Sequence, residues 1–133
     1  MPYLNVKLCA PPSPETTQRI ASFLTDLTAS ILHKKQEVTA VAVEYLPAQQ
    51  WFIGGTSQAA RGAATFYLDI KVTEGTNTKN EKAEYIKRVF AGFEAALGRI
   101  DPASYIVIHE VRADAWGYAG ETQEYRYIRG KPL

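Results

Sequence analysis

Residues 3 to 8 of the chain, Tyr-Leu-Asn-Val-Lys-Leu, recur at residues 67 to 72 as Tyr-Leu-Asp-Ile-Lys-Val, 64 residues later. Both stretches alternate in polarity and are rich in side chains that favour β-structure, a pattern typical of strands with one buried face. A stretch that returns with the same alternation indicates two copies of one structural unit. The sequence that follows each copy should then repeat as well.

A helical pattern follows each predicted strand. Ser13 and Pro14 are typical of a helix start, because a side-chain acceptor precedes a residue with a preset φ. Apolar residues behind them are spaced as one helical face, and a matching face follows the second strand and stops before Gly98. The two faces consist of Ile20, Phe23, Leu24, Leu27 and Ile31, and of Ile86, Val89, Phe90, Phe93 and Leu97.

Each predicted helix is followed by a second β-rich run and then by an aromatic residue that leads into glycine. The β-rich runs are residues 38–46 and 105–111, and the glycine motifs begin at Trp51 and Trp116, 65 residues apart. Glycine permits the tight backbone that such a turn requires. Because five features recur in one order at nearly constant spacing, we interpret the chain as a tandem repeat of a β-α-β unit.

The predicted fold is α+β, with two tandem β-α-β units that form a four-stranded sheet and place two helices on one face. We assign residues 1–133 to a single domain, with repeat one at about 2–60, repeat two at about 64–121 and a strand-like tail at 122–133. The other face and the edges of the sheet lack cover, and a homotrimer would bury them.

The composition favours a small-molecule partner. A net charge of +1 gives no reason to expect binding to nucleic acid or to an anionic membrane. Cys9 is the single cysteine, so no intrachain disulfide can form, and His33 and His109 are isolated, so no metal is expected. The N-terminus lacks the pattern of a signal peptide, and we therefore expect a cytoplasmic protein.

The Met1-Pro2 start, the doubled unit and the aromatic-glycine turns resemble the tautomerase superfamily. Single units resemble 4-oxalocrotonate tautomerase, and the fused form is similar to macrophage migration inhibitory factor, 5-(carboxymethyl)-2-hydroxymuconate isomerase and cis-3-chloroacrylic acid dehalogenase. In that family the methionine is removed, the exposed proline acts as acid or base, and fused members assemble as trimers with sites between subunits. The resemblance implies a cofactor-independent tautomerase of a small 2-oxo or 2-hydroxy-enoic acid.

The resemblance also assigns roles to residues of this chain. Pro2 would be the general base, because a proline at the start of a chain carries an amine, whereas an internal proline carries an amide. An apolar pocket would lower the pKa of that amine from about 7.7 to 8.0 towards neutrality. Lys34 would bind the substrate carboxylate, Ile70 would offer a backbone amide, Tyr105 would come from a neighbouring subunit, and Trp116 is a further pocket candidate.

Departures from the family leave alternatives open. Pro12 and Ala40 stand where 4-oxalocrotonate tautomerase carries two arginines, and Thr73 and Thr76 stand where the dehalogenase carries its pair. A dicarboxylate substrate held by paired arginines is therefore not expected. The enzymatic alternative is a hydratase, dehalogenase or decarboxylase that uses a protonated Pro2. Another is a non-catalytic trimer that binds a partner.

Each candidate residue also has a structural interpretation. A proline commonly begins an edge strand, and a lysine such as Lys34 behind a helix commonly faces solvent. Tyr105 and Trp116 would equally suit a core or a subunit interface. In the second repeat Phe66 or Ala64 stands where the first has Pro2, so the chain offers one proline site.

Overall fold

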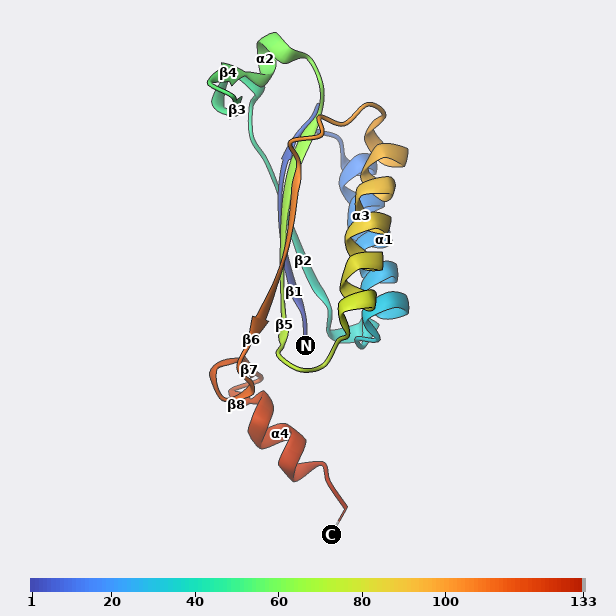
Figure 1. The fold of residues 1–133 in the computed structure, drawn as a ribbon, viewed down its shortest axis with the longest axis vertical. Helices are drawn as coiled ribbons and strands as arrows, with labels where there is room; N and C mark the ends of the chain where they lie inside the picture. Colours follow the sequence, from blue (N-terminus) through green and yellow to red (C-terminus); the bar gives the residue numbers. More distant parts are fainter. Residues whose placement is uncertain (133) are drawn as a thin grey trace.

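In the computed structural model, which describes residues 1–132, two long helices cover one face of a four-stranded sheet (Figure 1). The strands follow the order β2-β1-β5-β6, and α1 and α3 connect β1 to β2 and β5 to β6. The bounds are Tyr3–Cys9 for β1, Pro14–Leu32 for α1, Ala40–Tyr45 for β2, Thr65–Thr73 for β5, Lys79–Leu97 for α3 and Tyr105–Val111 for β6. The predicted α+β fold of two β-α-β units is confirmed.

The sheet register relates the two units to each other. β1 runs parallel to β2, β5 runs parallel to β6, and β1 and β5 are antiparallel. Tyr3 lies opposite Ala40, and Tyr67 lies opposite Tyr105, so Phe66 rather than Ala64 takes the place of Pro2 in the second unit. Because the first strands are antiparallel, equivalent parts of the two units lie at opposite ends of the sheet.

Local sequence fixes the helix ends. The Ser13 hydroxyl accepts a hydrogen bond from the Thr16 backbone N–H at 3.0 Å, so α1 begins where its capping residue predicts. Gly98, with a φ of 83°, ends α3 as predicted. His33 ends α1 in the left-handed helical region, with a φ of 59° and a ψ of 37°, although it is not a glycine.

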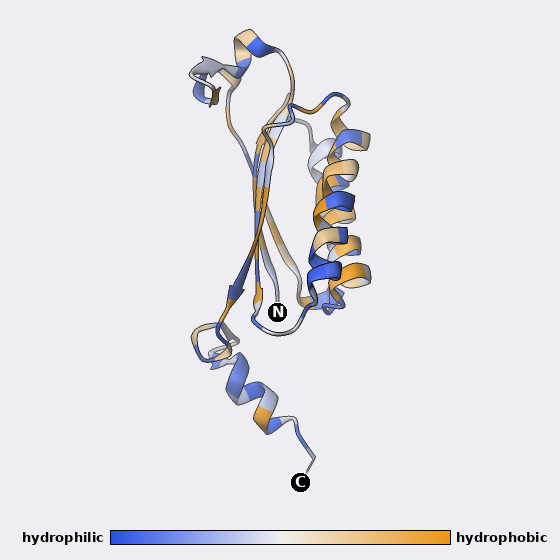
Figure 2. Ribbon diagram, viewed as in Figure 1, coloured by the Kyte–Doolittle hydropathy of each residue, from blue (hydrophilic) through white to orange (hydrophobic). Residues whose placement is uncertain are grey.

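The core lies between the helix layer and one sheet face. In Figure 2 the apolar colour follows the long strands and the helices beside them. The buried face of α3 differs from the prediction at its first position, because Tyr85 is fully buried and Ile86 is 40% exposed, whereas Val89 and Phe93 are buried as predicted. The Tyr85 hydroxyl can be buried because it lies 2.9 Å from the hydroxyl of the equally buried Thr28. The fully buried side chains include Leu4, Val6, Leu8, Ile20, Leu24, Phe66, Leu68, Ile70, Val89 and Phe93.

The opposite face of the sheet has no covering element among residues 1–132. Tyr3, Tyr105 and Val107 are exposed on it, at 39%, 63% and 36% of their surface. Within residues 1–132 no helix combines the length and apolar character that a membrane span requires.

Two small hairpins extend the ends of the sheet, one after β2 and one after β6 (Figure 1). We call residues 48–61 hairpin module one and residues 113–129 hairpin module two. Each contains a 3-10 turn, a two-stranded hairpin and a short helix. Module one holds β3 (Phe52–Ile53), β4 (Thr56–Ser57) and α2 (Gln58–Arg61), and module two holds β7 (Gly117–Tyr118), β8 (Glu121–Thr122) and α4 (Gln123–Arg129).

The prediction of a strand-like tail at residues 122–133 is wrong. Residues Gln123–Arg129 form the helix α4, which begins where the Thr122 hydroxyl accepts from the Tyr125 backbone N–H at 3.0 Å. The aromatic residues of this stretch favour strands, but α4 lies beyond the end of the sheet, where no strand offers an edge for pairing (Figure 1). The last residue of the predicted tail, 133, lies outside the described residues.

Candidate active site

The amino terminus, the loop after α1 and hairpin module two meet at one end of the sheet (Figure 1). Pro2 is buried directly before β1, and its carbonyl accepts from the Ala40 backbone N–H at 3.2 Å. The indole Nε1 of Trp116 donates to the Met1 carbonyl oxygen at 2.8 Å. That carbonyl is bonded to the nitrogen of Pro2, so Trp116 lies next to the predicted catalytic atom.

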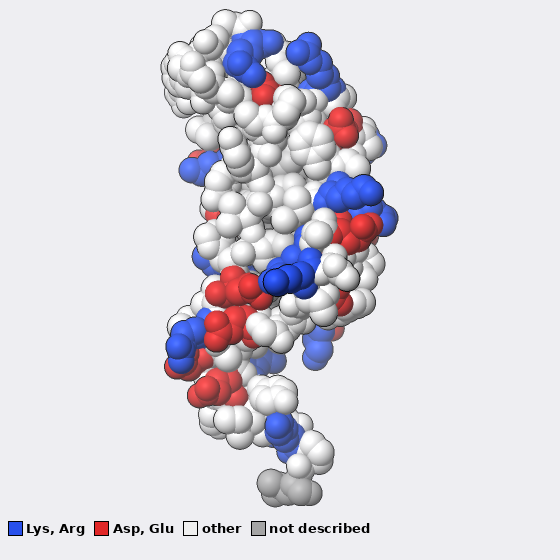
Figure 3. All heavy atoms as spheres, viewed as in Figure 1, with Lys and Arg blue, Asp and Glu red and all other residues white. Residues whose placement is uncertain are grey.

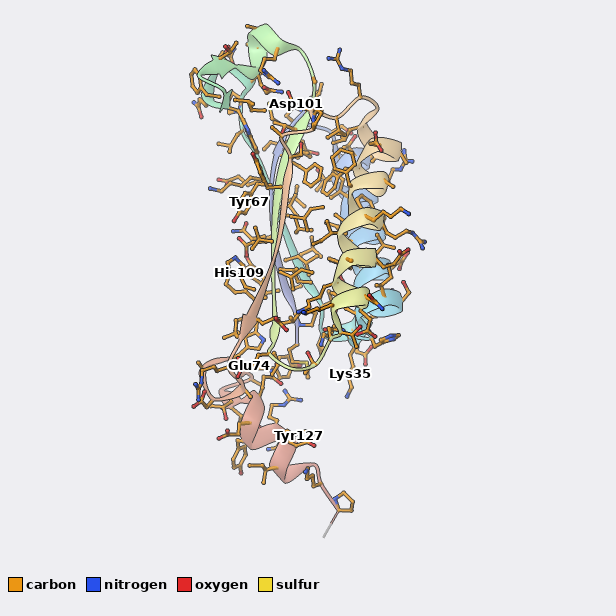
Figure 4. The ribbon with its side chains drawn as sticks, in the orientation of Figure 1. Lys35, Tyr67, Glu74, Asp101, His109 and Tyr127 are labelled. Atoms are coloured by element: carbon orange, nitrogen blue, oxygen red, sulfur yellow. The ribbon has the colours of Figure 1, made fainter. Side chains whose placement is uncertain are left out.

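The amino-terminal group lies in a positive environment. Burial lowers the pKa of this amine most, and Lys34, Arg126 and Lys35 lower it further. Both causes act in one direction, because burial and neighbouring cations each disfavour a protonated amine. Figure 3 shows acidic as well as basic side chains in the lower part of the molecule, and Figure 4 places Lys35 there. This amine belongs to Met1, and the next residue, Pro2, is itself buried.

Lys34 is half-buried at this end. The left-handed turn at His33 starts the loop that carries it, and its Nζ donates to the Thr76 hydroxyl at 2.7 Å. Burial lowers the pKa of Lys34, and Glu81 partly opposes this shift. Lys34 therefore contacts the segment between β5 and α3, which carries Thr76.

The sequence analysis missed two polar residues of α4. The guanidinium carbon of Arg126 lies 4.4 Å from the centroid of the Tyr118 ring, in a cation–π contact. The side-chain nitrogen of Gln123 is buried and has no hydrogen-bond partner among residues 1–132. The signal was present in the repeat, since Gln58 and Arg61 precede them by 65 residues. This repeated pair was overlooked because residues 122–133 were predicted to form a strand.

Ile70 lies inside the sheet rather than at the end that holds Pro2. It is fully buried in β5, opposite Leu4 of β1 and Ile108 of β6. Tyr3 pairs with Lys71, so the residue next in register to Pro2 is Val72. The structure of the single chain does not bring the Ile70 backbone next to Pro2.

Tyr105 lies at the far end of the sheet. It begins β6 opposite Tyr67, and 63% of its surface is exposed. Any contribution to the site around Pro2 would have to come from another copy of the chain. One chain therefore brings together Pro2, Lys34 and Trp116 and leaves Tyr105 apart from them.

A hollow of about 580 Å³ lies at the end of the sheet opposite Pro2. Its lining is mostly alanine and proline with Cys9 and Tyr45, and it contains no charged side chain. Burial raises the pKa of the Cys9 thiol, which keeps the sulfur protonated and unreactive. We assign the candidate site to the Pro2 end, because the predicted site residues Pro2, Lys34 and Trp116 lie together there.

Comparisons with known proteins place the chain in a family. The model of the tautomerase enzyme family matches twice, at residues 2–61 and 67–126. No curated protein matches the chain. A solved structure described as a fused 4-OT wild-type symmetric trimer has 18% identity and a TM-score of 0.82, with 97% of this chain and 99% of that chain covered.

Two further solved structures share the fold. A macrophage migration inhibitory factor-like protein from Entamoeba histolytica is 21% identical with a TM-score of 0.75, and 91% of this chain and 97% of that chain are covered. A protein whose crystal structure is described as inactivated by 2-oxo-3-pentynoate is 13% identical with a TM-score of 0.82, and the covered shares are 92% and 98%. At these identities the likeness establishes the architecture.

Proposed function

The chain belongs to the tautomerase family, and from this membership we propose that it is a cofactor-independent tautomerase with Pro2 as its general base. The substrate class is a small 2-oxo or 2-hydroxy-enoic acid. Removal of Met1 would convert the Pro2 nitrogen from an amide into a secondary amine, which has the lone pair that a base requires.

One observation carries the proposal, namely that burial and three neighbouring cations lower the pKa of the Met1 amino group, one residue before Pro2. An ordinary α-amino group has a pKa of about 7.7 to 8.0 and is mostly protonated at neutral pH. Burial and three neighbouring cations increase the neutral fraction, and only the neutral amine can accept a proton. The hydratase, dehalogenase and decarboxylase alternatives use a protonated Pro2, so the same environment weighs against them.

The proposed reaction moves one proton and needs no oxidant or reductant. The Pro2 amine takes a proton from the 2-hydroxyl group of the enol. The electron pair left on oxygen then forms the C2 carbonyl, and the electrons of the C2–C3 double bond move onto C3. The protonated amine then returns the proton to carbon. Trp116 Nε1, which donates to the Met1 carbonyl at 2.8 Å, would donate to the substrate oxygen once Met1 has left. Lys34 would attract the carboxylate.

We propose a homotrimer in which the uncovered sheet face is buried. Exposed Tyr3, Tyr105 and Val107 on that face support this, and so does the trimeric relative. Tyr105 would then reach the site of a neighbouring subunit. The role of the Ile70 amide stays a prediction. The single cysteine is compatible with a reducing compartment, so we also infer a cytoplasmic location.

The test uses protein whose intact mass verifies the loss of Met1. Turnover of enol phenylpyruvate and of 2-hydroxymuconate is followed by ultraviolet absorbance, in the wild type, in Pro2→Ala and in the control Pro11→Ala at an exposed proline. We expect Pro2→Ala to lose at least about 100-fold in kcat/KM, because a positioned general base contributes about 10² to 10⁴. Pro11→Ala should stay within about twofold of wild type, far inside that range.

Two other outcomes are informative. Equal activity in the wild type and Pro2→Ala would remove Pro2 from the mechanism. Absence of turnover with both compounds, together with a native-host mass that retains Met1, would overturn the enzyme proposal in favour of a non-catalytic oligomer.

A further inference from the structure

The two hairpin modules share one backbone arrangement. In module one the Gln58 backbone N–H donates to the Trp51 carbonyl at 2.8 Å, and in module two the Gln123 N–H donates to the Trp116 carbonyl at 2.8 Å. Each short helix then places an arginine three residues after its glutamine, Arg61 in α2 and Arg126 in α4. The two glutamine–arginine pairs therefore start from equivalent backbone positions.

In module one this pair binds oxygen atoms supplied by the chain itself. Arg61 donates to one carboxylate oxygen of Asp101 through Nε at 3.0 Å and through Nη2 at 2.7 Å. Gln58 Nε2 donates to the same oxygen at 3.4 Å and to the Ala63 carbonyl at 2.8 Å. Asp101 is buried, with 4% of its surface exposed. Module one is thus a built carboxylate-binding arrangement whose ligand is Asp101.

In module two the same pair lacks that ligand. The loops before β2 and β6 have equal length, and the residue in the place of Asp101 is Gln36, whose amide donates to Asp26 at 3.3 Å. Within residues 1–132, Arg126 forms no ion pair, and the buried Nε2 of Gln123 has no hydrogen-bond partner. A buried donor without an acceptor is unusual and points to an absent partner.

We infer that Gln123 and Arg126 bind the carboxylate of the substrate, in the way that Gln58 and Arg61 bind Asp101. The inference rests on the proposed function, because it names the groups that hold the substrate of that site. Arg126 lies close enough to lower the pKa of the amino terminus, and Trp116 of the same module contacts Met1. A ligand on these residues would lie beside the Pro2 nitrogen.

The charges at this end fit a small anion with a second oxygen acceptor. Lys34, Lys35 and Arg126 all lower the pKa of the amino terminus, and Glu81 faces Lys34. Arginine binds carboxylates through paired N–H groups, and the Tyr118 ring holds its guanidinium in place at 4.4 Å. Gln123 supplies a donor for a carboxylate, carbonyl or hydroxyl oxygen. A 2-oxo acid carries both acceptors on adjacent carbon atoms.

The experiment measures binding of a carboxylate that the enzyme cannot convert. Calorimetric titration of Met1-free protein with 3-phenylpropanoate is compared with titration of the neutral 3-phenylpropanamide. We expect Arg126→Leu to weaken carboxylate binding at least about tenfold, since a hydrogen bond to a charged group contributes that much or more, and Gln123→Leu to weaken it less. Binding of the amide should change less than about twofold in Arg126→Leu, because it carries no charge.

Arg61→Leu is the matched control. It removes the equivalent arginine from module one and should leave the dissociation constant of 3-phenylpropanoate within about twofold of wild type, since Arg61 lies at the other end of the sheet. Equal carboxylate affinity in wild type and Arg126→Leu, or no carboxylate binding by the wild type, would overturn the inference. Arginine-dependent binding without turnover would support the inference and count against the proposed tautomerase.

Discussion

The two ends of the sheet carry the same hairpin module in two chemical states. At one end the Gln58 side-chain nitrogen and the Arg61 guanidinium donate to the buried carboxylate of Asp101 (Figure 4, top), although the buried Oε1 of Gln58 has no hydrogen-bond partner within residues 1–132. At the other end Gln123 and Arg126 have the same placement without an internal acceptor. The difference shows that, in a protein with an internal repeat, the contacts of a residue in one copy can indicate the role of the equivalent residue in the other copy. A pair that stabilises the fold in one copy is available for a ligand in the other.

The first strands of the two units differ in the same sense. Phe66 stacks on Phe93 with ring centroids 3.8 Å apart and an interplanar angle of 12°, deep in the core. Its counterpart Pro2 lies where the chain enters β1, beside the cations of the site. One position is therefore built for packing and the other for chemistry, and the predictions below address this contrast.

The largest expected effect comes from alanine at these two positions. Phe66→Ala should lower the free energy of unfolding by about 3 to 5 kcal/mol, because it leaves a cavity beneath the helix layer. Pro2→Ala should lower it by about 1 kcal/mol or less, since the main loss is chain stiffness. Urea unfolding of both variants gives the comparison. Similar losses would show that Pro2 is a packing residue.

The next effect concerns the Asp101 carboxylate. The Ala103 backbone N–H, first, and then Arg61 hold the pKa of this group below its usual value. A lowered folded-state pKa contributes stability above the unfolded pKa of about 3.9, and this stability is lost as the pH falls through the folded value. Asp101→Asn should therefore melt several degrees below wild type at pH 7, and the gap should narrow below about pH 4.

Asp114→Asn is the control for that experiment. Asp114 lies in module two, is half-exposed and faces Arg112 at 3.5 Å. An exposed pair of this kind contributes little, so its melting temperature should stay close to wild type at every pH. A larger loss for Asp114→Asn than for Asp101→Asn would contradict the assignment of the structural carboxylate to module one.

The smallest effect is a shift in the pH dependence of turnover. Arg126 lowers the pKa of the amino-terminal amine, so Arg126→Leu should raise it. Because the base must be neutral, the acidic limb of kcat/KM should move to higher pH. Arg61→Leu should leave the limb in place. A shift to lower pH would mean that Arg126 does not act on the base.

Much of this fold could be predicted because local sequence patterns indicate the strands and helices of each unit. The alternating strands and the Ser13 cap depend on neighbours in sequence, and both lie where expected. The prediction of the helical face left out Tyr85, because a pattern of apolar residues does not include a tyrosine. The Tyr85 ring can be buried because its hydroxyl pairs with that of Thr28, which is far away in the sequence. The tail was misjudged because strand propensity says nothing about whether an unpaired edge lies nearby.

The candidate site was predictable only in part. Pro2 and Lys34 stand out through family position and do lie at one end of the sheet with Trp116. The predicted role of the Ile70 amide came from alignment alone. The sequence of one strand does not give its pairing register with another strand, so the position of Ile70 relative to Pro2 could not be predicted. Gln123 and Arg126 carry no unusual pattern by themselves. Their proposed binding role comes from the contacts that Gln58 and Arg61 make with Asp101, and these contacts are seen only in the structure.

The hydrogen bond between Trp116 and the Met1 carbonyl ties two events to one cleavage. If Pro2 is the base, Met1 behaves as a prosegment of a single residue, because its departure both creates the amine and frees the indole donor. The unprocessed chain would then be folded but latent. An affinity tag fused ahead of Met1 would keep the Pro2 nitrogen an amide and make the protein inactive without unfolding it. Recombinant preparations with and without such a tag would then differ in activity.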